Sequence, residues 1–340
     1  CSIECRREET LPNWLQKGPV AVTKSFDDRT YQRYEEGLKQ LISSASPLKN
    51  QILEGYQRPD PSSHPVSWSR LNPSQQQAAQ AALDAKHLAL IHGPPGTGKT
   101  HTAVELAKEY LRRRKTVWLL ADSNAATDHL GLALVAQGIN IVRLGSVYRM
   151  SVEMKKHSLH SQIQNHPQQI ALSILQKDID KSEPKQRGSL YKERNKLRNN
   201  IKQQILNNAD IIVSTLGSIG RYVSKLSRCD VAIIDEATQA IAPAILSVIP
   251  FMEKCILIGD PKQLGPVVTM PKNILNSDLF STLVTTSDAP ILLEQRRMNQ
   301  HIMKLIGDQY GAEFHAHSSV EHQHLQQYHP NFNIQSNVLW

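Results

Sequence analysis

Eight consecutive residues, Gly93 to Thr100, have the types and spacing of a phosphate-binding loop. They read Gly-Pro-Pro-Gly-Thr-Gly-Lys-Thr and fit the pattern G-x-x-x-x-G-K-[ST]. Glycines let the backbone turn its N–H groups toward phosphate oxygens, and the helix that follows adds positive potential at its start. The Lys99 ammonium can reach β- and γ-phosphates, and the Thr100 hydroxyl can ligate Mg²⁺. The residues predicted to contact nucleotide here are Gly93, Pro94, Pro95, Gly96, Thr97, Gly98, Lys99 and Thr100.

An acidic pair, Asp235 and Glu236, supplies the groups that triphosphate hydrolysis requires. It ends the apolar run Val-Ala-Ile-Ile at 231–234, which reads as a buried strand. We expect Asp235 to hold the metal together with Thr100, and Glu236 to orient the attacking water as a base. The loop and the pair together predict a nucleotide-binding domain that uses ATP and Mg²⁺.

The elements that must position these groups alternate along the chain. An apolar run at 87–92 precedes the loop, and apolar residues recur at helical spacing over 102–112. Such alternation of strands and helices predicts an α/β fold, with a parallel, doubly wound sheet covered by helices on both faces. The predicted strands are 87–92, 116–121, 139–144, 210–215, 231–235, 255–259 and 290–293.

Two segments stand outside this alternation. Residues 30–55 predict one N-terminal helix, followed by a linker rich in Pro and Ser over 58–73. Residues 148–208 are polar and helical in pattern and predict an inserted subdomain, with its turn at 184–188. Between 150 and 208 there are eleven lysines and arginines but only five acidic residues, so this segment carries most of the chain's net charge of +8. A basic surface of this kind suits phosphate backbones, although any single lysine is more often only a solvated residue.

Composition places the chain among soluble globular proteins. Its 340 residues are 40% hydrophobic and 21% charged, and no apolar run reaches the ~20 residues of a membrane helix. The absence of a signal-peptide pattern after Cys1 suggests a fragment or a processed product. Of the four cysteines, Cys229 and Cys255 read as buried free thiols, and Cys1 and Cys5 as a weak candidate for a metal site. This cysteine usage fits a reducing compartment, either the cytoplasm or the nucleus, or a bacterial cytosol.

Three further polar segments suggest which nucleotide-driven protein this is. The Gln75 amide, upstream of the loop, could pair with an adenine edge and select ATP. Residues 259–266 follow another predicted strand, at the sheet edge where ligands bind. Residues 293–298 read Leu-Glu-Gln-Arg-Arg-Met, and a guanidinium there suits a γ-phosphate.

On these motifs the chain resembles the superfamily 1 helicases, in the 5′-to-3′ branch that includes the nonsense-mediated-decay RNA helicase. The resemblance covers about 31–340 and implies a RecA-like first domain with a stalk helix and a helical insertion. The matching motifs are the Q motif at Leu71, Asn72 and Gln75; motif I at 93–100; motif Ia at 122–128; the segment 214–218; motif II at 235–239; motif III at 259–268; and motif IV at Gln295, Arg297 and Met298.

The resemblance also implies roles for single residues. Gln263 would sense the γ-phosphate, and Arg297 would contact it in the closed state. Ser123, Asn124 and Thr215 would hold a single strand of RNA or DNA, although each could instead cap a helix or form a turn.

Three departures from the family pattern stand out. Asp122 replaces a usual Pro, and Arg296 replaces the aromatic that stacks on adenine, a task that a planar guanidinium can also perform. Asn299 and Gln300 replace a His-Pro pair.

The resemblance divides the chain as 1–60 (N-terminal segment with stalk), 61–147 with 209–312 (RecA-like core), 148–208 (basic helical insertion) and 313–340 (linker into a second RecA-like domain that is absent). We therefore expect a monomeric helicase fragment, without membrane contact, that hydrolyses ATP weakly until the second domain completes the site. Two alternatives stay open: a ring-forming AAA+ ATPase, and an ATP-gated nucleic-acid clamp without turnover.

Overall fold

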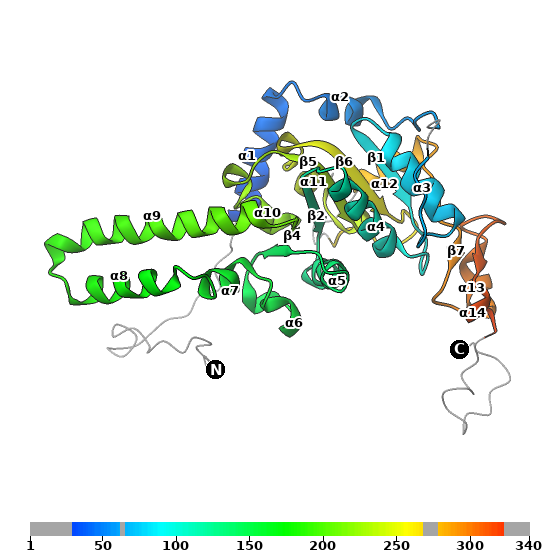
Figure 1. The fold of residues 1–340 in the computed structure, drawn as a ribbon. Helices are drawn as coiled ribbons and strands as arrows, with labels where there is room; N and C mark the ends of the chain where they lie inside the picture. Colours follow the sequence, from blue (N-terminus) through cyan, green and yellow to red (C-terminus); the bar gives the residue numbers. More distant parts are fainter. Residues whose placement is uncertain (1–28, 62–64, 268–277, 323–340) are drawn as a thin grey trace, which may run out of the picture.

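A parallel sheet of six strands forms the centre of the protein (Figure 1). The computed structural model describes residues 29–61, 65–267 and 278–322. The strand order is β1-β6-β5-β2-β4-β3, and every neighbouring pair is parallel. The predicted α/β class with a parallel sheet is therefore confirmed. The strands are β1 Leu88–His92, β2 Val117–Ala121, β3 Ile141–Leu144, β4 Ile211–Thr215, β5 Cys229–Asp235 and β6 Met252–Gly259.

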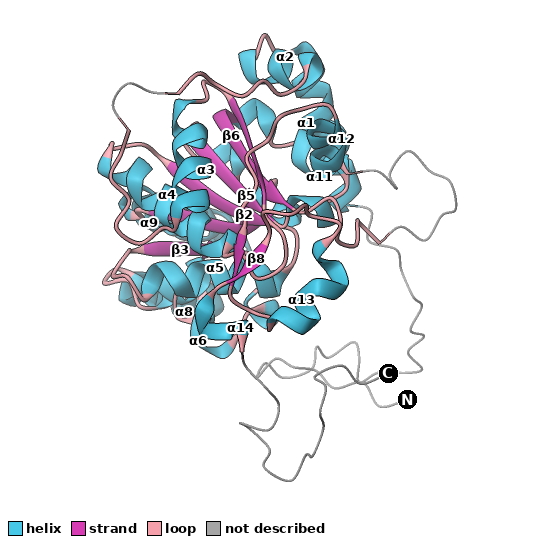
Figure 2. Ribbon diagram, turned by 90° about the vertical axis from the view of Figure 1, so that its right-hand side faces the viewer, coloured by secondary structure: helices cyan, strands magenta, loops and turns pink. Residues whose placement is uncertain are grey.

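The strands bury both faces because their side chains alternate between two apolar cores. Leu88 and Leu90 of β1 join one core, whereas Ala89 and Ile91 join the other. The helices on the second core are α3 Pro73–Asp84, α4 Lys99–Arg112 and α5 Asn124–Val135. Those on the first include α1 Arg29–Ser43, α2 Pro47–Glu54, α10 Leu216–Ile219, α11 Ala242–Leu246 and α12 Leu279–Thr285, and the helical segment 159–208 adds Leu159, Leu172 and Ile201 to this core. Figure 2 shows helices on both sides of the strands.

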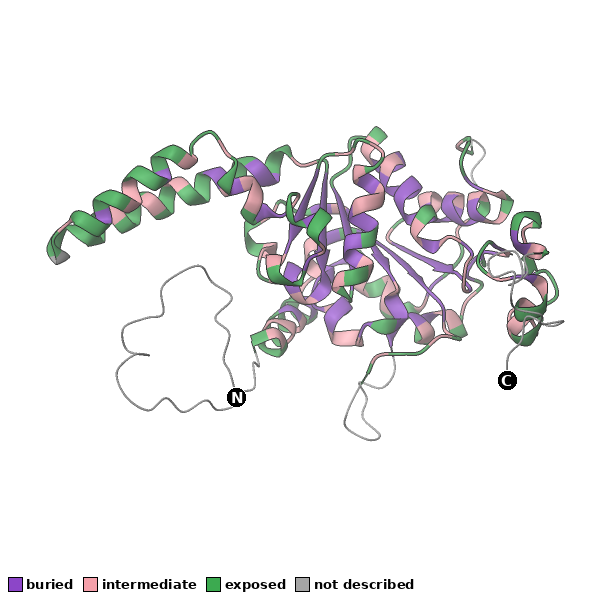
Figure 3. Ribbon diagram, turned by 90° about the horizontal axis from the view of Figure 1, so that it is seen from below, coloured by how far each residue is buried: buried purple, intermediate pink, exposed green. Residues whose placement is uncertain are grey.

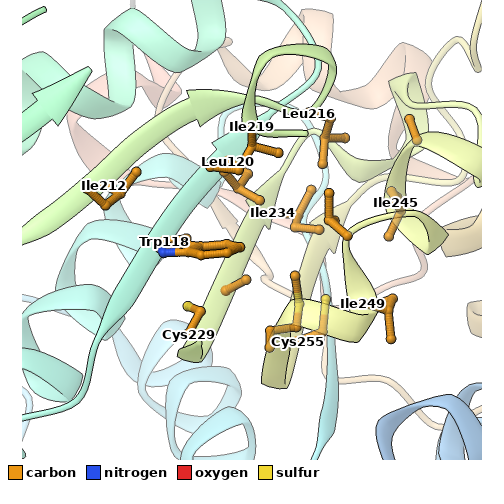
Figure 4. Close-up of a cluster of buried hydrophobic side chains, with 14 of the residues drawn as sticks. Trp118, Leu120, Ile212, Leu216, Ile219, Cys229, Ile234, Ile245, Ile249 and Cys255 are labelled. Carbon is orange, nitrogen blue, oxygen red and sulfur yellow. The ribbon is translucent and has the colours of Figure 1, made fainter. Parts of the chain in front are cut away.

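Part of the first core is drawn in Figure 4, where Trp118, Leu120, Ile212 and Ile234 lie together over the sheet. The thiols of Cys229 and Cys255 are free and buried in the same core, and burial raises the pKa of both thiols. The interpretation of these two cysteines as buried thiols is therefore confirmed. Cys1 and Cys5 lie outside the described residues, among which no group of three His, Cys, Asp or Glu side chains could hold a metal ion.

The predicted insertion consists of helices, two of which form a long pair that extends away from the sheet (Figure 1). Much of this pair is exposed (Figure 3). Its turn lies at Ser182 and Glu183, so the predicted turn at 184–188 was wrong. Pro184 occupies the first turn of the second helix, where a missing N–H costs nothing and the ring's fixed φ suits the helix. The elements are η2 Val147–Arg149, α6 Val152–Lys155, α7 Leu159–Gln164, α8 Gln169–Lys181 and α9 Pro184–Asn208.

Two further sequence predictions differ from the structure. The helix predicted over 30–55 is divided into α1 and α2, because Pro47 disfavours helical backbone in the residue before it. The strand predicted at 290–293 is only a bridge from Ile291 to His92. Two hydrogen bonds hold it beside β1: His92 N donates to Pro290 O and Leu292 N donates to His92 O, each at 2.9 Å.

After this bridge, a small two-stranded sheet and two helices close the described chain. The strands are β7 Glu294–Gln295 and β8 His315–Ala316, and the helices are α13 Gln300–Gly307 and α14 Ser318–Glu321. The segment predicted as a linker from 313 therefore carries β8 and α14 as far as it is described. Short helices of one turn complete the core: η3 Val223–Lys225, η4 Ala237–Gln239 and η5 Ile249–Phe251. Within the described ranges, no helix has the length and apolar character to cross a bilayer.

Candidate nucleotide and nucleic-acid sites

The loop 93–98 joins β1 to α4 and has a shape that only glycine permits at three positions. Gly96 and Gly98 adopt φ values of +77° and +80°, which residues with a Cβ rarely adopt. A Cβ on Gly93 would lie 2.3 Å from Cγ of Lys99. The loop is therefore an open cradle around the start of α4, and phosphate oxygens fit such a cradle.

The basic and acidic groups predicted for catalysis meet beside this loop. The Thr100 hydroxyl donates to Asp235 Oδ2 over 3.0 Å, although β1 and β5 are separated by β6 in the sheet. The Lys99 ammonium donates to Gly93 O over 3.0 Å and lies 3.6 Å from Glu236 Oε1. Parallel strands that end at one edge bring the four side chains together.

The Asp235 carboxylate is poised to receive a cation. Burial, and then the neighbouring Glu236 charge, raise its pKa to about 6, against the opposing effects of Lys99 and the Thr100 hydroxyl. An ionised group in this position is costly unless a positive charge joins it. Together with the Thr100 hydroxyl it forms a pair of hard oxygen ligands, so these residues fit Mg²⁺.

Replacing Asp235 with Asn should make the metal-free protein more stable at alkaline pH. The pKa of the Asp235 carboxyl in the folded protein is above its usual value of 3.8. Its charge therefore destabilises the fold progressively as pH rises from about 3.8 to the folded pKa, and the full destabilisation is reached above the folded pKa. Asn carries no charge at any pH. The free energy of unfolding of Asp235→Asn, relative to that of the unaltered chain, should therefore increase by on the order of 1 kcal/mol between about pH 5 and about pH 8. Urea unfolding with a chelator measures this difference, and a constant difference would contradict the buried charge.

Glu236 has an unusual backbone. Its φ of +51° lies in the left-handed region, and its N–H donates to Asp235 Oδ1 over 2.9 Å. Such a conformation costs free energy in a residue with a Cβ, and strained residues of this kind tend to cluster at functional sites. The turn directs the carboxylate toward the Lys99 ammonium, at the mouth of the cradle.

Gln75 contacts the phosphate loop itself. Its Nε2 donates to Thr97 O over 2.9 Å, and its Oε1 accepts from Asn72 N over 3.0 Å in the capping box of α3. The amide is buried, and an adenine edge could use only its second hydrogen and remaining lone pair. These contacts assign Gln75 the support of the loop, and its predicted contact with adenine stays a prediction.

The two arginines of motif IV lie beside the loop in different settings. Arg296 N donates to Gly96 O over 2.9 Å, and the Arg296 guanidinium is paired with Glu294, with Nη2 2.9 Å from Oε1. Arg297 is exposed, and a Cβ on Gly96 would lie 2.7 Å from the Arg297 Cβ. Both are therefore brought to the nucleotide cradle, and the predicted stacking of Arg296 on adenine stays a prediction.

A buried network around Asp260 was not predicted from the sequence. Its Oδ2 accepts from Gln263 Nε2 and from the Tyr310 hydroxyl, each over 2.9 Å, and its Oδ1 lies 3.1 Å from His92 Nε2. These hydrogen bonds oppose the effect of burial and hold the pKa of Asp260 below its usual value. Gln263 is thus tied to the strand that leads into the phosphate loop. Val268, the last residue matched to motif III, lies outside the described residues.

A hollow of about 510 Å³ lies at the same edge of the sheet as the phosphate loop. It contains Asn124 and Thr215, two of the three residues predicted to hold nucleic acid. Ser123 is not part of it, because its hydroxyl caps α5 by accepting from Ala126 N over 3.1 Å. Four guanidinium groups line the hollow, from Arg29, Arg33, Arg149 and Arg221, and one carboxylate does, from Asp122. Asp122 is exposed to solvent, but the surrounding protein partly desolvates its carboxyl and raises its pKa.

Comparison with known proteins shows which family the chain resembles. A family model described as an AAA domain matches residues 70–190 and 181–271. A protein of Methanocaldococcus jannaschii named as an uncharacterized ATP-dependent helicase is 30% identical, over 89% of this chain and 54% of its own length. The DNA polymerase alpha-associated DNA helicase A of Schizosaccharomyces pombe is 29% identical, over 91% of this chain and 50% of its own.

The upf1 helicase of the same yeast has higher identity over a shorter region. It is 36% identical over 68% of this chain and 26% of its own length. The chain thus spans about half or less of the length of these curated relatives. All three relatives are named as helicases, and none of their names describes a ring-forming ATPase.

Proposed function

The chain belongs to the superfamily 1 helicases related to upf1, and from this premise we propose that it forms the ATP-binding half of a motor that moves on single-stranded nucleic acid. The observation that carries the proposal is the meeting of Lys99, Thr100, Asp235 and Glu236 at one edge of the sheet. The arginine-lined hollow at the same edge supports a nucleic-acid site beside the ATP site.

In the proposed ATP site each residue has a task that its position suits. The loop N–H groups and Lys99 bind phosphate oxygens, and Thr100 with Asp235 would hold Mg²⁺. The metal, when bound, would neutralise charge that develops on the phosphates. Glu236 takes a proton from water that it orients against the γ-phosphate. Gln263 and Arg297 would contact that phosphate once the site closes.

For the nucleic acid we propose a single strand that crosses the hollow around Asn124 and Thr215. Contacts to phosphates bind a strand without reading its sequence, as a motor requires. The guanidinium groups of Arg149 and Arg221 provide the charge for such contacts. The direction of travel proposed for the whole protein is 5′ to 3′, and its strand is RNA or DNA.

The proposed motor acts as a monomer whose second RecA-like domain completes the ATP site. An arginine from such a domain is worth about 10³-fold or more in related NTPases, so this chain alone should hydrolyse ATP slowly. The names of the relatives favour a helicase over a ring-forming ATPase. A clamp without turnover disagrees with the complete set of groups around Asp235 and Glu236.

The proposal is tested by measuring ATP hydrolysis by the chain with single-stranded RNA, with single-stranded DNA and with neither. Stimulation by a strand supports a motor and ranks the two nucleic acids. If the chain binds ATP but neither binds a strand nor hydrolyses ATP faster in its presence, the result would contradict the motor. Failure to bind ATP at all would contradict the nucleotide site itself.

Replacing Arg221 with Gln should reduce the salt dependence of strand binding. Each phosphate contact that is lost lowers the slope of log affinity against log salt by about 0.7 for a single strand. Arg114 is a matched control, because it is exposed and precedes β2 at the opposite edge of the sheet. Fluorescence anisotropy over a series of salt concentrations measures both variants. Equal slopes for the two variants would place the strand elsewhere.

A further inference from the structure

Arg143 on β3 is completely buried, which is unusual for a guanidinium. Its Nε donates to Asp128 Oδ1 over 2.9 Å, its Nη2 donates to Asn124 Oδ1 over 3.0 Å, and its Nη1 donates to Leu144 O. The charge is balanced by Asp128, whose other oxygen accepts from Ser151 N over 2.7 Å. Each of the three guanidinium nitrogens therefore has a fixed partner.

The bond to Asn124 determines which end of that amide faces the hollow. A guanidinium only donates, so the atom of Asn124 that meets Arg143 is the oxygen. The Asn124 Nδ2 group, with its two hydrogens, is then the end left for the arginine-lined hollow, which Asn124 helps to line. Phosphate oxygens accept hydrogen bonds and cannot donate them, so this orientation is the one that suits a nucleic-acid backbone.

We infer that Arg143 is a positioning residue that holds the Asn124 amide with its donor end toward the phosphates of a bound strand. The inference rests on the proposed function and adds to it a residue that does not line the hollow. A balanced ion pair with Asp128 alone would need only one or two guanidinium nitrogens. The Nη2 of Arg143, which donates to Asn124, connects the buried ion pair to the surface.

The arrangement also connects the hollow to the helical insertion. Asp128, on α5, holds the backbone N–H of Ser151, and the Ser151 hydroxyl caps α6 by accepting from Met154 N. Arg143 thus connects Asn124, which lines the hollow proposed for nucleic acid, to the first turns of the insertion.

The test is a double-mutant cycle between Arg143→Lys and Asn124→Ala, read as affinity for fluorescein-labelled oligouridine and oligothymidine of equal length. A lysine keeps the positive charge beside Asp128 but cannot span both Asp128 and Asn124. Each single change should weaken strand binding by about 3- to 10-fold. The double variant should bind no more weakly than Asn124→Ala alone, because Arg143 acts through Asn124. If the double variant instead loses affinity by the product of the two single fold-changes, the inference is overturned.

A third variant tests the orientation without changing Arg143. In Asn124→Asp one oxygen can still accept from Arg143, whereas the end toward the hollow becomes an acceptor that repels phosphate. It should bind the strand more weakly than Asn124→Ala, and equal or tighter binding would overturn the inference. ATP affinity should stay unchanged in all these variants, and measuring it checks that each variant retains the fold. Absence of strand binding by the unaltered chain would instead contradict the proposed function, and the inference with it.

Discussion

Replacing Glu236 with Gln should lower the rate of strand-stimulated ATP hydrolysis by roughly 10²- to 10⁴-fold, the usual contribution of a general base. Gln keeps the size of the side chain and can adopt the same backbone, but it cannot take a proton from water. ATP binding should be retained or strengthened, because the change removes a negative charge that lies 3.6 Å from the Lys99 ammonium. A phosphate-release assay and a separate ATP titration measure the two effects.

Glu253→Gln is the matched control for charge. Glu253 is exposed on β6, near the strand's start and away from the edge that carries the site. It should leave hydrolysis unchanged. If Glu236→Gln hydrolyses ATP at the rate of the unaltered chain, another group is the base. Loss of ATP binding in this variant would mean that Glu236 supports the phosphate loop and not the water.

The local patterns of the sequence predicted most of the fold because most strands of the six-stranded sheet are short, mainly apolar runs that both cores bury. Leu88 to His92 and Cys229 to Asp235 are such runs, and each ends in a polar residue at the sheet edge. The prediction was wrong where one residue decides a boundary. Pro47 divides a helix and Pro184 begins one, and the hydrophobic pattern shows neither effect.

The candidate site was predictable to the extent that neighbours in sequence define it. Lys99 and Thr100 follow the glycines, and Glu236 follows Asp235. The motifs also predicted that Thr100 and Asp235 meet, but other contacts between distant segments were not predictable. Tyr310 donates to Asp260 across 50 positions, and Lys254 donates to Leu83 O across 171. Gln75 is informative here, since its place beside the loop followed from the sequence, whereas its bond to Thr97 O required the fold.

The same distinction applies to the nucleic-acid side. Asn124 was predicted from its motif, but nothing in the sequence indicates that its oxygen is held by Arg143, 19 positions later. Nor does the sequence show that arginines from α1, from the segment after β3 and from the segment after α10 converge on one hollow. Convergence of this kind depends on the order of the strands, in which β3 and β4 are neighbours.

Replacing Gly96 with Ala should impair ATP binding and hydrolysis together, by on the order of tenfold or more in each. Gly96 has φ +77°, and an added Cβ would lie 2.7 Å from the Arg297 Cβ and 3.2 Å from the Arg297 N. The backbone of the motif IV segment cannot yield cheaply, because Arg296 N is bonded to Gly96 O. The methyl group should therefore push the phosphate loop and the Arg297 segment apart.

Gly138 provides a control that separates backbone strain from this contact. It has the same φ of +77°, and an added Cβ would meet nothing within 4 Å. Gly138→Ala should therefore cost only the strain of a left-handed alanine, about 1 kcal/mol of stability, and leave ATP affinity unchanged. Thermal unfolding and ATP titration of both variants provide the comparison. If the two variants lose equal ATP affinity, strain alone explains the effect, and the contact between the loop and the motif IV segment does not organise the site.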